Sequence, residues 1–68
     1  MDNFTKRQRK ELTAVAAGRD REDFLAMAEG SPEAADGVHR MLVKLDGLVP
    51  LSSVMQGVLA RVNAMRVR

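Results

Sequence analysis

The fold is decided by residues 48–65, LVPLSSVMQGVLARVNAM. Apolar side chains in this stretch are spaced alternately three and four residues apart, which is the pattern of a helix that packs one face on another helix. The stripe consists of Leu48, Leu51, Met55, Val58, Val62 and Met65. Ser53 and Gln56 fit a capping box, which places the helix at about 54–65. If Pro50 is instead the first helical residue, this helix is one turn longer.

Capping residues and glycines divide the rest of the chain. Thr5 and Gln8 fit a capping box, in which each side chain accepts the other residue's free backbone N–H, and a helix over about 6–17 follows. Glycine is a common residue just after a helix end. We expect three glycines to end helices in this way: Gly18, Gly30 and Gly47.

Two further helix starts lie in the middle of the chain. Asp20 is a plausible N-cap for a helix over about 21–29, whose first turn is acidic. Ser31 followed by Pro32 starts a third helix, which we expect to run to about Asp46. The buried face of this third helix is predicted to be Ala34, Val38, Met41, Leu42 and Leu45.

The sequence therefore predicts one all-α domain over residues 1–68, with three to four short helices in a small bundle. No alternating apolar run long enough for a strand is present. A short Gly and Pro connection joins the last two helices, which we expect to form an antiparallel hairpin.

Length and composition point to a protein that associates. A chain of 68 residues builds a small core, and with no Cys and one His it has no disulfide and lacks the ligands of a structural metal site. We expect a homodimer. No apolar run reaches the length of a membrane span, so we expect a cytoplasmic protein without a membrane partner. A composition rich in Ala, Arg, Val and Gly suits a small bacterial or phage protein.

The C-terminal hairpin is the first candidate binding surface. One interpretation of its stripe is a docking face for another protein; the other is a core face packed on the preceding helix. The opposite side carries Gly57, Ala60 and Ala64, which would let a second helix approach closely. The residues predicted to bind a partner are Val54, Met55, Val58, Leu59, Arg61, Val62, Met65, Arg66 and Arg68.

A basic cluster near the N-terminus offers a second candidate surface. Lys6, Arg7, Arg9 and Lys10 place four cations within one and a half helical turns, which would attract nucleic-acid phosphates. The chain has no Trp or Tyr for base stacking. Nucleic-acid binding by the first helix is therefore the alternative function.

Nothing in the sequence indicates catalysis. His39 has no Cys or second His near it, the serines fall at cap positions, and no glycine-rich phosphate loop occurs. We expect no catalytic residues, metal site or cofactor. The sequence thus predicts a non-enzymatic regulator, adaptor or inhibitor that binds another protein through its C-terminal hairpin.

Overall fold

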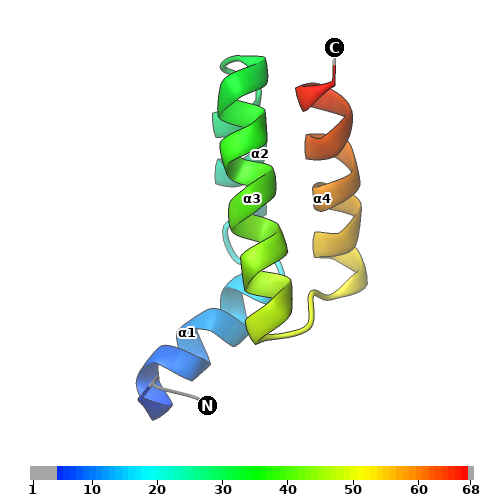
Figure 1. Ribbon diagram of the computed structural model, residues 1–68. Helices are drawn as coiled ribbons and strands as arrows, with labels where there is room; N and C mark the ends of the chain where they lie inside the picture. Colours follow the sequence, from blue (N-terminus) through cyan, green and yellow to red (C-terminus); the bar gives the residue numbers. More distant parts are fainter. Residues whose placement is uncertain (1–4, 68) are drawn as a thin grey trace.

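The computed structural model describes residues 5–67, which contain four helices and no strand (Figure 1). The predicted all-α fold is confirmed. The helices are α1 (Lys6–Ala16), α2 (Arg21–Ala28), α3 (Pro32–Leu48) and α4 (Ser53–Arg66).

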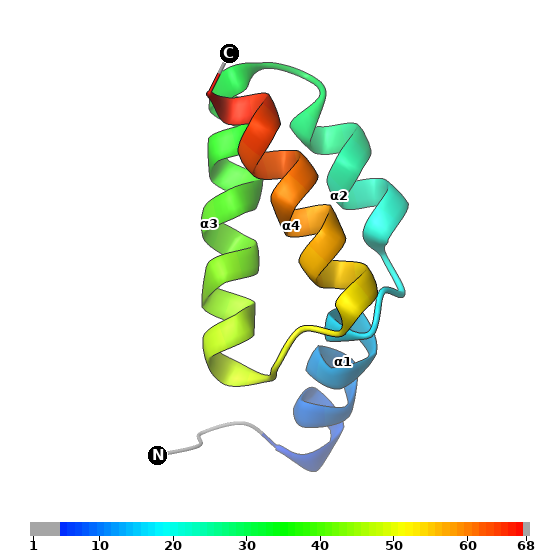
Figure 2. The ribbon, with the colours of Figure 1, turned by 90° about the vertical axis from the view of Figure 1, so that its right-hand side faces the viewer.

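α2, α3 and α4 pack together in a bundle, and α1 projects from one end of it. α2 and α4 both pack on α3, and α4 runs back along α3 in the opposite direction (Figures 1 and 2). α1 continues away from the bundle beyond the lower end of α3. The core between the helices consists of Ala16, Ala28, Ala35, Val38, Leu42, Leu45, Leu51, Met55, Val58 and Val62.

The predicted starts of α1 and α3 are confirmed. The Thr5 N–H donates to Gln8 Oε1 at 2.8 Å, and the Gln8 N–H donates to Thr5 Oγ1 at 3.2 Å, which completes the capping box. Ser31 Oγ accepts the Ala34 N–H at 3.0 Å, and Pro32 is the first residue of α3. These caps satisfy N–H groups that have no partner within their helices.

Gly18 separates α1 from α2, as predicted. Its φ of 115° is a conformation that residues with a side chain rarely adopt. The Gly18 carbonyl oxygen accepts a 2.9 Å hydrogen bond from Nη1 of Arg21, which stabilises the turn. Asp20 stands at the N-cap of α2 but its side chain does not cap the helix. That carboxylate instead accepts hydrogen bonds from Arg19.

Gly30 follows the end of α2 as expected, whereas the predicted end of α3 needs correction. α2 ends at Ala28 and Glu29 is its C-cap, so Gly30 comes directly after the cap. Gly47 does not end α3, which continues to Leu48. The stop comes from Pro50, because a residue before proline is driven out of the helical region, and Val49 is extended with φ −140° and ψ 126°.

The N-cap of α4 is Ser52 rather than Ser53. Ser52 Oγ accepts the Met55 N–H at 3.3 Å. Gln56 Nε2 donates to the Leu51 carbonyl oxygen at 3.1 Å, so the predicted capping box with Ser53 does not form. Because Ser52 is the N-cap, α4 starts at Ser53, one residue earlier than predicted.

The burial of three apolar residues differs from the prediction. Ala35 is buried, whereas Met41 and Leu48 expose 48% and 55% of their surface. Met41 and Leu48 are seven residues apart and so share one side of α3. Both side chains line a hollow together with Leu12 of α1 and Phe24 of α2. The core contact expected for these two side chains is therefore incomplete.

Candidate docking surface

The apolar stripe of α4 forms the core of this molecule. Met55 and Val62 are fully buried and Val58 nearly so, in the cluster that includes residues of α3. Of the two interpretations of the stripe, the core interpretation holds for these three residues. These side chains expose little or no surface within the chain, and their assignment as partner-binding residues stays a prediction.

The other predicted partner-binding residues occupy mixed positions. Val54 is exposed, and one of its methyl groups lies beside the Gly18 turn. Leu59 and Met65 are half-buried and pack against the core. Arg61 is exposed, and Arg68 lies outside the described residues. α4 therefore presents a discontinuous apolar surface, in which exposed and half-buried side chains are separated by small and polar ones.

Arg66 takes part in a partly exposed charge cluster between α3 and α4. Its Nη1 lies 3.5 Å from Asp36 Oδ1, and Arg40 Nε lies 3.1 Å from the other oxygen of the same carboxylate. Arg66 Nε also donates to Asn63 Oδ1 at 2.8 Å. The end of α4 is thereby joined to the first half of α3. Since its charge is already paired, Arg66 is less available to orient a partner than the sequence suggested.

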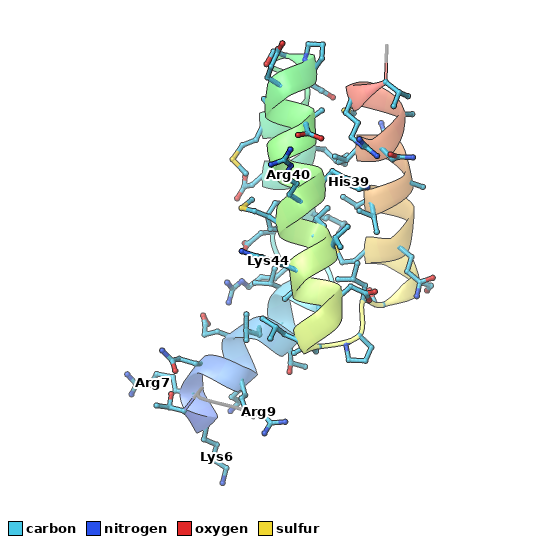
Figure 3. All side chains as sticks on the ribbon, in the orientation of Figure 1. Lys6, Arg7, Arg9, His39, Arg40 and Lys44 are labelled. Carbon is cyan, nitrogen blue, oxygen red and sulfur yellow. The ribbon has the colours of Figure 1, made fainter. Side chains whose placement is uncertain are left out.

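The basic cluster lies on the part of α1 that projects from the bundle. Lys6, Arg7, Arg9 and Lys10 are all exposed. Figure 3 shows Lys6, Arg7 and Arg9 pointing in different directions around the helix. The cluster therefore surrounds the helix and does not form a single basic face.

An apolar groove, which the sequence analysis did not identify, lies where α1, α2 and α3 meet. Its volume is about 250 Å³. We call it the α3 groove, and its lining residues are Leu12, Phe24, Met41, Leu42, Lys44, Leu45 and Leu48. Leu42 and Leu45 are buried at its base, while Met41 and Leu48 remain exposed. The seven-residue spacing of Met41 and Leu48 is visible in the sequence, but the departure of α1 is not.

A second hollow adjoins the α3 groove on the surface of α1. It has a volume of about 290 Å³ and shares Leu12 with the groove. Its other lining residues are Arg7, Gln8, Glu11 and Val15. Glu11 is engaged within the chain, because both of its carboxylate oxygens accept hydrogen bonds from Arg19 Nη1, at 3.0 and 2.9 Å.

Arg19 joins α1 to the turn that follows it. Its guanidinium also donates to Asp20 at 3.2 Å. Hydrogen bonds to Asp20 and then to Glu11 raise the pKa of Arg19. All three side chains are at least partly exposed, which limits what the ion pairs contribute to stability.

The remaining features predicted from the sequence are at the surface or half-buried. Gly57, Ala60 and Ala64 are exposed on the outer side of α4, and His39 is half-buried. Within residues 5–67 no group of His, Cys, Asp or Glu is arranged to hold a metal ion. In the same part of the chain no helix has the length and apolarity that crossing a bilayer requires.

Comparison of the chain with protein-family models, with curated proteins and with solved structures found no match.

Proposed function

We propose that this protein acts without catalysis, as a small regulator, adaptor or inhibitor that binds another protein through its C-terminal helical hairpin, α3 and α4. The observation that carries the proposal is the α3 groove, which lies on the α3 half of this hairpin and has no α4 residue in its lining, and where Met41 and Leu48 remain about half exposed beside a buried base. Clustered apolar side chains at a surface mark interaction sites more often than scattered ones do.

Burial of the exposed apolar side chains of the α3 groove would supply the free energy of binding. Fully burying a Met or Leu side chain contributes about 1.5–3 kcal/mol. The α4 stripe already contributes this to the core, whereas Met41 and Leu48 do so only in part. A partner that covers the α3 groove would complete their burial. Docking would then use α3 for apolar contact, with the exposed Lys44 at the groove influencing orientation.

Affinity capture tests this proposal. The tagged protein is incubated with source-cell lysate at physiological salt, with and without nuclease, and captured proteins are identified and quantified by mass spectrometry. We expect one protein at fixed stoichiometry in both samples. Leu48→Glu should abolish its capture, whereas Val54→Glu should not, because Val54 is similarly exposed at 51% but lies on α4, outside the groove. Equal capture of background proteins by all three forms would contradict the proposal.

Nucleic-acid binding through α1 is the second candidate function. It is favoured by the exposure of Lys6, Arg7, Arg9 and Lys10 on a helix that projects from the bundle (Figure 3). Phosphate binding would weaken by orders of magnitude between about 50 and 200 mM salt, while apolar docking would change little. Loss of all captured material after nuclease would favour this function over protein binding.

Homodimerisation belongs to the same proposal. Gly57, Ala60 and Ala64 leave the outer side of α4 exposed and smooth, and space is open around Gly57. Sedimentation equilibrium of the wild type is the direct test. If two copies associate there, Ala60→Arg should yield monomers, whereas Ala26→Arg, at an exposed alanine on α2, should not. A wild-type monomer at about 1 mM would exclude the dimer.

A further inference from the structure

We infer that the α3 groove accepts an amphipathic helix of a partner protein, with acidic side chains flanking the apolar face of that helix. The inference rests on the proposed protein-binding function and names the chemistry of the partner. It follows from the shape of the groove and from the charges around it.

The shape of the groove favours a helix. Met41, Leu45 and Leu48 follow one another at spacings of four and three residues, so they form a ridge along one side of α3. Leu12 of α1 and Phe24 of α2, both half-buried, bound the ridge. A partner helix with apolar residues at the same spacing packs its own ridge beside this one. Residues 5–67 contain no strand, so they offer no sheet edge to an extended peptide.

Met41 suits a groove of this kind. Its side chain is unbranched and its sulfur is polarisable, so it adjusts to apolar surfaces of different shapes. It exposes 48% of its surface at the groove, whereas Met55 in the core exposes none. The adaptable side chain therefore lies where a partner would contact it.

The charges around the groove are basic. Lys44 lines the α3 groove and Arg7 lines the adjoining hollow, and neither forms an ion pair or hydrogen bond within residues 5–67. Figure 3 shows Lys44 on α3 above Lys6 and Arg7 on α1. The acid that lines these hollows, Glu11, is already held by Arg19. Acidic flanks on a partner would therefore meet unpaired cations.

Other charges nearby do not reverse this sign. The acids of the first turn of α2, Glu22 and Asp23, line a separate depression together with Arg19, Asp20 and Arg21. A second copy of this chain is disfavoured in the groove, because a symmetric contact would bring its Lys44 and Arg7 against the same cations. The charges thus favour a different protein with acidic side chains.

Two designed peptides test the inference. Both are helical, of about 18 residues, with Leu at alternating spacings of three and four; one has Glu at its flanking positions and the other has Lys. Binding is measured by fluorescence anisotropy and by ¹⁵N-edited NMR of the intact protein. We expect the Glu peptide to bind at least about tenfold more tightly than the Lys peptide at low salt, and the difference to shrink at high salt. Amide shifts should concentrate at the residues of the α3 groove.

Charge and apolar variants locate the site. Leu48→Glu should weaken Glu-peptide binding by about tenfold or more, whereas Val54→Glu, at an exposed apolar residue of α4 outside both hollows, leaves it unchanged. Lys44→Glu should weaken binding of the Glu peptide and strengthen binding of the Lys peptide. Arg61→Glu is the matched control on α4, because Arg61 is exposed but lies outside both hollows. NMR spectra of each variant confirm that it is folded.

Several results would overturn the inference. Equal affinity for the two peptides, no binding of either at about 1 mM, or shifts confined to the outer side of α4 would each do so. An oligonucleotide that displaces the Glu peptide from the groove would assign the site to nucleic acid instead. If Leu48→Glu abolishes capture of a lysate protein while the two peptides bind with equal affinity, the inference of an acidic partner helix is wrong and the proposed protein-binding function stands. If no lysate protein is captured, the proposed function itself fails.

Discussion

The backbone N–H of Ser52 donates a 3.0 Å hydrogen bond to the carbonyl oxygen of Ala16. This bond joins the residue that caps α4 to the last residue of α1. It satisfies one of the carbonyl groups that have no partner within α1. The last turn of α1 is therefore part of the bundle, with Ala16 buried, while its first turns extend beyond the core.

Met55 is predicted to be essential for folding. It is fully buried, and Met55→Ala should lower the free energy of unfolding by about 2–5 kcal/mol. A domain this small has a total stability of about that size, so the variant should be largely unfolded at 25 °C. Far-UV circular dichroism during urea titration measures the loss. Met27→Ala is the control, because Met27 is 49% exposed and its truncation should cost less than about 1 kcal/mol.

Alanine substitutions at the two neighbouring serines distinguish the observed cap from the predicted one. Ser52→Ala removes the oxygen that accepts the Met55 N–H, and should cost about 1 kcal/mol of stability. Ser53→Ala should change stability by no more than about 0.5 kcal/mol, since Ser53 is exposed and the Ser52 cap remains. Urea titrations of both variants give the comparison. A larger loss for Ser53→Ala would place the cap at Ser53.

Two glycines should respond to alanine with opposite signs. Gly18→Ala forces a side chain into a conformation with φ 115°, which should cost about 1–3 kcal/mol. Gly57→Ala should instead add about 0.5–1 kcal/mol, because Gly57 lies inside α4 with open space around it. Thermal unfolding followed by circular dichroism gives both values. A stabilising Gly18→Ala would contradict the observed turn.

Asp36 should contribute to stability in a salt-dependent way. Asp36→Asn weakens the ion pairs with Arg40 and Arg66, and should cost about 0.5–1 kcal/mol at low salt, because these side chains are partly exposed. The loss should diminish as added salt screens the charges. Urea titrations at two salt concentrations test this. Glu29→Gln, which removes an exposed acid with no ion pair within residues 5–67, should show no such loss.

The fold was predictable because strong local signals agree with the packing. The Thr5–Gln8 capping box, the Ser31–Pro32 start and Gly18 each act within a few residues, and each is confirmed. The three-and-four spacing of Met55, Val58 and Val62 required only one neighbouring helix to be buried. Such features depend little on the path of the rest of the chain.

Two predictions about α3 were wrong, namely the residue at which it ends and the burial of its apolar face. The first depends on a proline beyond the helix, and the second depends on segments distant in the sequence. Gly47 was expected to end α3, and Pro50 was considered only as a first residue of the last helix, but the steric effect of Pro50 on Val49 ends α3 instead. The exposure of Met41 and Leu48 depends on how far α1 and α2, which meet at the Gly18 turn, cover this side of α3. Periodicity identifies an apolar face but does not say which helix covers it. The α3 groove was therefore not predictable from the spacing alone.

The exposure of Met41 makes the groove sensitive to oxidants. Peroxide transfers an oxygen atom to a methionine thioether, giving a polar sulfoxide and water. Met41 should react well before Met55, which is fully buried. Peptide mass spectrometry after limited peroxide treatment measures the two rates. Met27 is equally exposed and should react at a similar rate. A dose that converts these two residues while Met55 stays reduced would add a polar S=O group beside the apolar ridge and leave the helical core intact, so oxidation would weaken docking in a protein that is still folded.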